Sequence, residues 1–368
     1  MAHNIIVVGG SAGSLEALLE LTGQLKRDLD AALFVVIHFP PFGVSHLPHI
    51  LNRSGTLPAH IPADGEYIEN GRLYVSELDH HLVIQGNRIR LTRDARENHS
   101  RPAIDPLFRS AAASYGPNVT GVILSGLLND GTSGLIEIKR RGGIAIVQNP
   151  ASALFTDMPR SAIDHVPGVD YVLDPDEIAA QLVRITQHRA KISETARATM
   201  PGGKDELGEE SKSSVLSVQQ DVTAHDMGER DGEPSIYSCP DCGGVLWPVA
   251  EENFLRFRCH VGHAFSAESL LQQQSEVLEG SMWYALRTVL DKARLARQLA
   301  GSARERGHAT SVNHFEEQAR VAEHHGEVIR AILSSSVAGK DVPPKEKPSP
   351  GKTTVGDAKS RNDPGNGH

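Results

Sequence analysis

A serine, a histidine and an aspartate that could form a hydrolytic triad lie in the first half of the chain. Ser11 falls within residues 9–13, GGSAG, which satisfy the G-x-S-x-G pattern of a nucleophile on a sharp strand-to-helix turn. His38 stands directly before an F-P-P run, and Asp130 lies in an N-D-G sequence. A hydrolytic serine needs a base that accepts its proton and a carboxylate that orients the base. Ser11, His38 and Asp130 supply these three groups.

Each of these residues also has a purely structural interpretation. Ser11 could cap the helix that follows it, and Asp130 could close an Asx-turn before Gly131. His38 is one of 18 histidines, so it could lie at the rim of a sheet without a catalytic role. A glycine-rich first turn also begins dinucleotide sites, but Ser11 occupies the place of the second glycine in the G-x-G-x-x-G pattern.

The three cysteines of the chain indicate a metal site. Cys239 and Cys242 form a C-x-x-C knuckle, and the sequence CHVGH begins at Cys259. Three thiolates and one histidine are a usual ligand set for tetrahedral zinc. His263 is the preferred fourth ligand and His260 the alternative. The set leaves no open position, so we expect a structural Zn²⁺ that stabilises a segment with little core of its own.

The other interpretations of the cysteines are a trio of buried thiols or a redox-active C-x-x-C pair. The second lacks the βαβ context that such a pair requires. An odd, clustered set of cysteines argues against a disulfide framework and favours a reducing compartment, so we expect a cytoplasmic protein.

The elements that must position the triad candidates follow from hydrophobic patterning. Residues 4–8 and 33–37 are short, apolar and β-branched, with a helical pattern between them. Strand, helix and strand make a βαβ unit, which implies a parallel sheet. The three candidate residues follow these strands and a third at 119–124. They would therefore lie at carboxyl ends of strands, where an open parallel sheet lines its ligand crevice.

The expected fold class is α/β, with a doubly wound, mostly parallel sheet of Rossmann-like topology, a small zinc-ribbon-like module and an α-helical hairpin. Turn sequences between about 60 and 95 predict β-hairpins, including one strand at 72–75. The remaining elements expected in the sheet domain are helices near 106–114, 132–141 and 176–189, and strands at 144–147 and 169–173.

Composition divides the chain into five segments. We expect, in order, the domain with the triad candidates over 1–190, a flexible linker over 191–235, the zinc-binding module over 236–265, the helical hairpin over 266–335 and a disordered tail over 336–368. The hairpin could pack only on itself or serve as a docking element for another protein.

The overall charge and hydrophobicity exclude some partners. The formal charge of -9 disfavours nucleic acid, because phosphate contacts need clustered Lys and Arg. No apolar run reaches the roughly 20 residues that span a bilayer, and the N-terminus lacks a signal-peptide pattern. We therefore expect no nucleic-acid partner and no membrane insertion.

Several strings resemble the catalytic domain of the CheB-type protein-glutamate methylesterases of chemotaxis. They are VVGGSAG at 7–13, VIHFP at 36–40, SRPAIDPLF at 100–108, SGLLNDG at 125–131 and the segment 151–159. The order serine, histidine, aspartate matches that family and differs from α/β-hydrolases, in which the acid precedes the histidine. The resemblance covers about residues 1–190.

The resemblance implies a hydrolase that cleaves glutamate methyl esters on a chemoreceptor and releases methanol, and that also deamidates glutamines. Ser11 would be the nucleophile, His38 the general base and then acid, and Asp130 the group that orients His38. The backbone N–H groups of Ala12 and Leu127 would form the oxyanion hole. No catalytic cofactor is implied.

The sequence departs from the family pattern in three ways. The triad domain begins at about residue 4, so we expect no receiver domain in this chain, and a separate response regulator is a possible partner. Ala12 replaces a frequent threonine, and Leu128 replaces a frequent glycine, which could reshape the loop of Asp130. Two functions remain as alternatives to a protein-glutamate methylesterase: a serine esterase for small molecules, and a signalling scaffold with a vestigial triad.

Overall fold

The computed structural model describes residues 4–39, 43–199, 233–251 and 254–338. The chain divides into two compact units, Met1–Val277 and Leu278–His368, which are described separately below. Most of the predicted linker (200–232) and of the predicted tail (339–368) lies outside the described residues.

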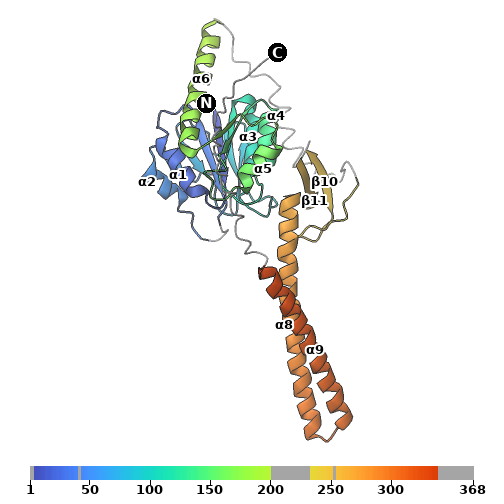
Figure 1. The fold of residues 1–368 in the computed structure, drawn as a ribbon. Coiled ribbons are helices and arrows are strands. Elements are labelled where there is room, and N and C mark those ends of the chain that lie inside the picture. Colours follow the sequence, from blue (N-terminus) through green and yellow to red (C-terminus); the bar gives the residue numbers. More distant parts are fainter. Residues whose placement is uncertain (1–3, 40–42, 200–232, 252–253, 339–368) are drawn as a thin grey trace, which may run out of the picture. The chain divides into compact units, whose positions relative to one another are not determined.

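A parallel sheet forms the centre of the first unit, with helices on both sides of it (Figure 1). The sheet has seven strands in the order β3-β4-β2-β1-β7-β8-β9. Its strands are β1 (Ile5–Gly10), β2 (Ala32–Ile37), β3 (Ala59–His60), β4 (Leu73–Val75), β7 (Val119–Ile123), β8 (Ile144–Gln148) and β9 (Tyr171–Leu173). Every pairing within this sheet is parallel. The predicted doubly wound α/β fold is confirmed.

Helices cover both faces of the sheet, which explains why its strands are apolar without alternation. Ile5 and Val7 pack into the core under α3, α4 and α5, whereas Ile6 and Val8 pack into the opposite core under α1, α2 and α6. The bounds of these helices are α1 (Ser14–Gln24), α2 (Leu47–Ser54), α3 (Ile104–Tyr115), α4 (Thr132–Arg140), α5 (Asp157–His165) and α6 (Pro175–Thr199), with a 3-10 turn at Gly116–Asn118.

Two details differ from the sequence prediction. The run 72–75 belongs to no hairpin: β4 lies in the main sheet, parallel to β2, because all three of its residues are buried and need cover on both faces. The predicted hairpin exists only as β5 (His81–Gln85) and β6 (Arg88–Thr92). Helix α6 also continues to Thr199, beyond its predicted end at 189.

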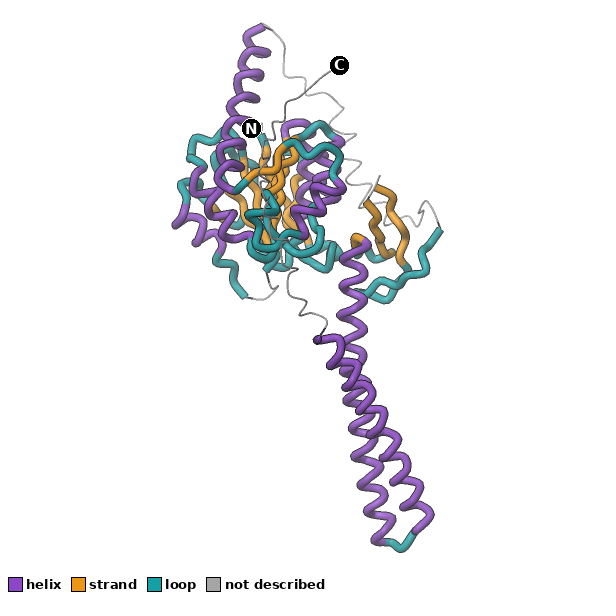
Figure 2. Tube along the Cα trace, in the orientation of Figure 1, coloured by secondary structure: helices purple, strands orange, loops and turns teal. Residues whose placement is uncertain are grey.

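A small antiparallel sheet follows Cys239 and Cys242 in the sequence, and Cys259 ends its second strand (the strands are drawn in Figure 2). It comprises β10 (Leu246–Glu251), β11 (Phe254–Cys259) and β12 (Ala264–Ser266). Its core is small, with Leu246, Phe257 and Phe265 packed beside two of the cysteines. Helix α8 (Ala267–Glu305) begins directly after β12.

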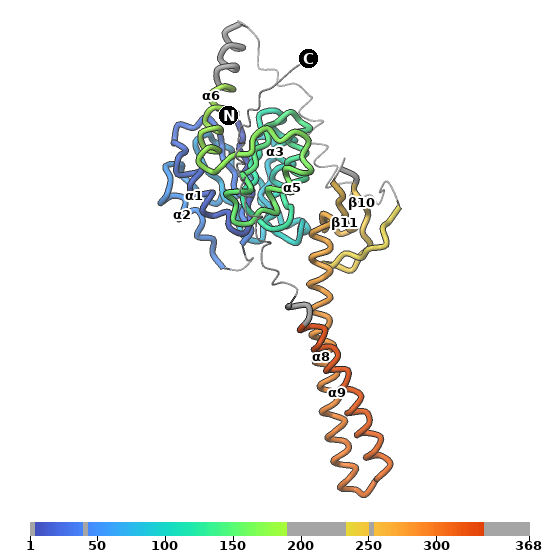
Figure 3. The backbone as a smooth tube through the Cα atoms, viewed as in Figure 1, coloured from blue at the N-terminus to red at the C-terminus, as the bar shows by residue number. Residues whose placement is uncertain are grey.

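The second unit holds most of α8 and the following helix α9 (Ala309–Ala338), joined by a turn at Gly307 (Figure 3). Small residues are buried along both helices: Ala293, Ala296, Ala300 and Ala303 on α8, and Ala319 and Ala322 on α9. An ion pair between Arg297 and Glu323, at 2.7 Å, joins the two helices. In the described part of the chain, no helix is long and apolar enough to cross a membrane.

Candidate active site and metal centre

The three triad candidates lie at one edge of the main sheet. Ser11 follows β1 and His38 follows β2, and these strands are neighbours. The backbone N–H of Ser11 donates to the carbonyl of Ser125 at 2.9 Å, which ties it to the loop after β7 that carries Asp130. The chain winds outward in opposite directions from β1 and β7, so this edge contains the topological switch point at which open α/β sheets bind ligands.

The turn that presents Ser11 requires small residues. Gly13 has a φ of 71°, and a Cβ there would lie 2.7 Å from the Cβ of Leu154. A Cβ on Gly10 would lie 2.6 Å from the Cβ of Ser14. The N-cap position of α1 is Gly13 and no side chain caps this helix, so the capping interpretation of Ser11 is wrong.

His38 and Asp130 form a hydrogen-bonded pair. The distance from His38 Nε2 to Asp130 Oδ2 is 2.8 Å, and the Asp130 side chain is only 3% exposed. The two backbone N–H groups at the start of α3 also donate to this carboxylate, from Ile104 at 2.7 Å and from Asp105 at 3.3 Å. A helix N-terminus favours a negative charge, so Asp130 is held as an acceptor for the histidine.

The pKa of Asp130 reflects opposing effects. Burial raises it, but the hydrogen bond and charge of His38, the Ile104 N–H and the Asn98 amide lower it more, so the pKa lies below its ordinary value. Asp105 is buried next to Asp130, and burial together with that neighbouring charge raises the pKa of Asp105 to about 7. Of the two carboxyl groups, Asp130 is the one that stays ionised against the histidine.

A triad also requires a contact between the hydroxyl of Ser11 and the ring of His38. Among the described residues, no hydrogen bond joins Ser11 Oγ to His38, and such contacts often tighten only when substrate binds. Because Asp130 occupies Nε2, Nδ1 is the ring nitrogen of His38 that is left for the serine.

The predicted oxyanion donors flank Ser11. In the part of the chain that the structure describes, the backbone N–H groups of Ala12 and Leu127 have no hydrogen-bond acceptor. Gly126 lies against the serine, since a Cβ on it would be 2.9 Å from the Cβ of Ser11. Leu128 has a φ of 61°, the left-handed conformation that glycine adopts most easily. The loop thus keeps a glycine-like backbone despite the leucine.

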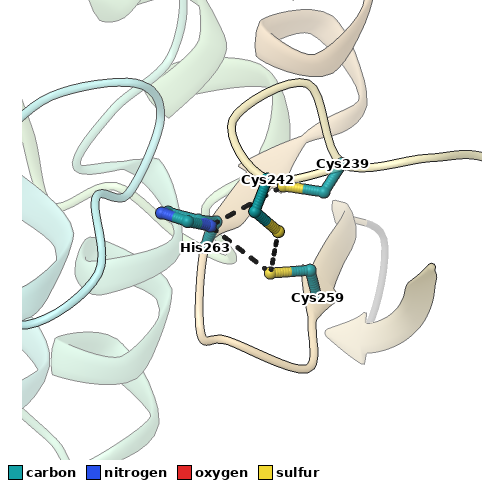
Figure 4. A group of neighbouring side chains, drawn as sticks. All are labelled: Cys239, Cys242, Cys259 and His263. Atoms are coloured by element: carbon teal, nitrogen blue, oxygen red, sulfur yellow. Dashed lines mark hydrogen bonds between the residues drawn. The ribbon is translucent and has the colours of Figure 1, made fainter. Parts of the chain in front are cut away.

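The three cysteines and His263 gather in one cluster, with all four ligand atoms within 4.8 Å of one another (Figure 4). The Sγ atoms of Cys242 and Cys259 are 3.6 Å apart, and His263 Nδ1 lies 3.5 Å from Cys259 Sγ and 3.7 Å from Cys239 Sγ. His260 is exposed and outside this cluster. The four predicted ligands therefore form a set that could bind a metal ion.

A carboxylate lies near the histidine of the cluster, beyond hydrogen-bond distance. His263 Nε2, the nitrogen that faces away from the sulfurs, lies 4.0 Å from Asp241 Oδ2. A carboxylate near the second nitrogen of a metal-binding histidine is a frequent arrangement, because it fixes the ring orientation.

Sequence reasoning missed two side chains at the site. Asn98 is buried and donates from Nδ2 to Asp130 Oδ1 at 3.0 Å and to Asp105 Oδ2 at 3.1 Å. Asn129 accepts a hydrogen bond at 2.6 Å from Ser266, a residue of the cysteine-bearing module. Neither could be found from local motifs, because their partners are distant in the sequence.

A doubly wound α/β domain with a serine on the first βα turn, beside a hydrogen-bonded histidine–aspartate pair, has the architecture of a serine ester hydrolase. The family model of CheB methylesterase matches residues 6–182. A relative in Leptospira interrogans, a putative protein-glutamate methylesterase/protein-glutamine glutaminase, is 34% identical over 189 residues, which are 51% of this chain and 97% of that protein. The chain belongs to the CheB methylesterase family.

A second relative agrees with this assignment. A protein-glutamate methylesterase/protein-glutamine glutaminase of Anaeromyxobacter dehalogenans is 38% identical over 181 residues, 48% of this chain and 52% of that protein. The crystal structure of the Thermotoga maritima CheB methylesterase catalytic domain matches with 30% identity and a TM-score of 0.48, covering 50% of this chain and all of that one. The matched family region, residues 6–182, stops short of the cysteines.

Proposed function

We propose that Ser11, His38 and Asp130 hydrolyse methyl esters of protein glutamate side chains. The observation that supports this most directly is the 2.8 Å contact between His38 Nε2 and Asp130 Oδ2 beside the serine turn. Ser11 Oγ attacks the ester carbonyl while His38 Nδ1 takes its proton, and His38 then protonates the departing methanol. A water activated by the same histidine releases the free glutamate.

The free N–H groups of Ala12 and Leu127 support the assignment of an oxyanion hole. Both are unpaired among the described residues; Ala12 directly follows Ser11, and Leu127 directly follows Gly126, which lies against the serine. Backbone donors aimed at the developing negative charge contribute a large share of catalysis in acyl transfer. The same acyl chemistry with ammonia as leaving group would deamidate glutamine, which the names of the relatives in Leptospira and Anaeromyxobacter include.

Exposed apolar side chains near the serine favour a protein substrate over a small ester. Leu154 is 72% exposed, Leu127 is 49% exposed and Phe39 is 39% exposed. Leu154 lies against the serine turn, and Phe39 directly follows His38. Exposed apolar groups clustered at a site are typical of interaction surfaces. We propose a methylated chemoreceptor as the substrate, with a cytoplasmic location and a separate response regulator as a possible regulator.

Methanol release from a methylated chemoreceptor cytoplasmic fragment tests this function. Ser11→Ala should abolish release, since removal of the nucleophile leaves only the small residual rate of the remaining site. Ser54→Ala, an exposed serine on α2, is the matched control and should retain the wild-type rate.

Three outcomes separate the alternatives. Equal methanol release by wild type and Ser11→Ala would contradict the triad. Hydrolysis of short-chain model esters without release from the receptor would favour a small-molecule esterase. Absence of both activities, with a signalling phenotype that survives Ser11→Ala, would favour a scaffold.

We propose that the cluster of Cys239, Cys242, Cys259 and His263 holds one structural Zn²⁺. Tetrahedral zinc, with bonds of about 2.3 Å to sulfur and about 2.0–2.1 Å to nitrogen, places sulfurs about 3.8 Å apart and sulfur about 3.5 Å from nitrogen. The separations of 3.6 Å between sulfurs and of 3.5 and 3.7 Å to nitrogen fit this geometry. Four such donors leave no position for substrate.

Metal analysis of the purified chain should find one zinc per chain. Cys242→Ser should lower the zinc content and the thermal stability of the module, because binding free energy becomes folding free energy in so small a core. His260→Ala, a change outside the cluster, should leave both unchanged. Full zinc content in Cys242→Ser would contradict this ligand set.

A further inference from the structure

The loop of residues 97–100 contacts the cysteine-bearing module, which comprises residues 236–251 and 254–266 with the cysteines and the small antiparallel sheet, through three consecutive residues. Glu97 pairs with Arg256 Nη2 at 3.0 Å. The backbone N–H of Asn98 donates to the carbonyl of Ala264 at 2.8 Å. His99 Nδ1 lies 3.3 Å from Asp241 Oδ1, the carboxylate that also faces His263. The loop and the module belong to the same compact unit, and the module fixes this loop along its length.

Asn98 joins the module to the triad candidates through the two ends of its amide. Its Oδ1 accepts from the backbone N–H of Ser266 at 3.0 Å and from Ser269 Oγ at 2.9 Å, both in the C-terminal segment. A backbone N–H can only donate, so the oxygen of the amide must face Ser266. Its nitrogen therefore faces Asp130 Oδ1, at 3.0 Å.

This contact bears on the orientation of the Asp130 carboxylate. Oδ2 receives His38 Nε2 and the Ile104 N–H, at 2.8 and 2.7 Å. Oδ1 receives Asn98 at 3.0 Å and the Asp105 N–H at a longer 3.3 Å. Asn98 is thus the shorter of the two contacts that hold Oδ1, and it helps to keep Oδ2 directed at the histidine.

The loop has a backbone conformation that needs support. Asn98 has a φ of 47° and His99 a φ of 62°, and consecutive non-glycine residues rarely adopt this left-handed region. Such conformations persist when the surrounding structure over-determines them. Here the module supplies many of the contacts that do so.

We propose that the module supports the active site from outside it, with Asn98 as a positioning residue that transmits the docking of the module to Asp130, so that metal loss from the module lowers the esterase rate. This inference rests on the proposed function of the triad. It gives the module a role in catalysis that involves no contact with substrate.

The first test compares kcat and KM for methanol release in Asn98→Gly, Ser269→Ala and the wild type. Glycine keeps the positive φ and removes the amide, so kcat should fall about 10- to 100-fold with KM changed little, because a displaced catalytic group slows chemistry rather than binding. Ser269→Ala, which removes one donor to the amide, should lower kcat less. Ser275→Ala on the same helix is the matched control and should not change it.

The second test combines Asn98→Gly with Asp130→Ala. If Asn98 acts through Asp130, adding Asn98→Gly to Asp130→Ala should produce no further loss of the residual rate. An effect of equal size in both backgrounds, or a wild-type kcat in Asn98→Gly, would overturn the proposal.

The third test removes the metal with a chelator and follows amide hydrogen exchange of residues 96–105 in the full chain. Faster exchange there, together with a lower kcat that zinc restores, is the expected result. Unchanged exchange would overturn the coupling even if the chain proved inactive on receptors, whereas a wild type that releases no methanol but shows the exchange response would contradict the proposed function alone.

Discussion

At the scale of single residues, Leu128 shows how the loop of Asp130 tolerates a departure from the family pattern. Its φ of 61° is the conformation that a glycine at this position would adopt without strain. A leucine there costs about 1–2 kcal/mol in backbone conformation. Leu128 does not displace Asp130 from His38, since the two side chains lie 2.8 Å apart.

Substitutions at Leu128 should separate backbone strain from side-chain packing. Leu128→Gly relieves the left-handed strain but increases the entropy of the unfolded chain by a similar amount, so the free energy of unfolding should change by less than about 1 kcal/mol. Leu128→Val places a β-branched residue at positive φ and should lower it by more than about 1 kcal/mol. Urea denaturation followed by circular dichroism measures both, and equal values for the two variants would contradict this account.

At the scale of elements, the loop of residues 97–100 carries the buried ion cluster that joins the module to the sheet domain. Burial raises the pKa of Glu97, but the charges of Arg109, Arg256 and Arg258 outweigh it and hold the pKa far below its ordinary value. Glu97 is therefore ionised in the folded chain. A pKa lowered by folding contributes stability that is present above the ordinary pKa of about 4.5 and is lost as the pH falls toward the folded value.

Glu97→Gln should destabilise the first unit by about 3–5 kcal/mol at pH 7, because it leaves buried arginine charge without its carboxylate. The difference in unfolding free energy between Glu97→Gln and wild type should be constant between pH 6 and 8. It should shrink below about pH 4.5, because there the unfolded wild type binds a proton at Glu97 that the folded wild type does not. Unfolding free energies measured across this pH range test the sign. Glu137→Gln, which removes a half-buried carboxylate on α4, is the comparison and should cost less, because its partner Arg140 is exposed to solvent.

Sequence patterns predict some of the strands correctly and others not. β1 and β2 were predictable because a buried parallel strand is apolar on both faces. The sequence pattern predicts a hairpin for the run 72–75, because a short strand between turn sequences has the same pattern whether it pairs with a neighbouring or with a distant strand. Its place beside β2 depends on burial, which a local pattern does not reveal.

At the scale of the whole molecule, the second unit is a helical pair built on small residues. The buried alanines of α8 recur at spacings of three and four residues, from Ala293 to Ala303. This spacing places them on one stripe of the helix and lets the second helix approach closely. A larger side chain at one of these buried alanine positions would have to displace its neighbours.

Ala296→Leu should lower the stability of the helical pair by about 1–3 kcal/mol, because added methylenes overfill a close interface. Ala331→Leu, at an exposed position of α9, should have little effect. Thermal unfolding of the full chain by circular dichroism compares the two, and metal content should stay unchanged in both. Equal melting profiles for Ala296→Leu and wild type would indicate a looser interface than the structure has.

The sequence by itself determined the fold class, the family and the types of the chemical groups. A glycine-rich turn, buried strands and a cysteine–histidine spacing are local features, and local chain geometry dictates them. Only the tertiary structure decided which groups meet: that Nε2 rather than Nδ1 of His38 faces Asp130, and that Asn98 links Asp130 to Ser266, which lies 168 residues after Asn98 in the sequence. Contacts of this kind depend on how separate elements pack, and no spacing along the chain specifies them.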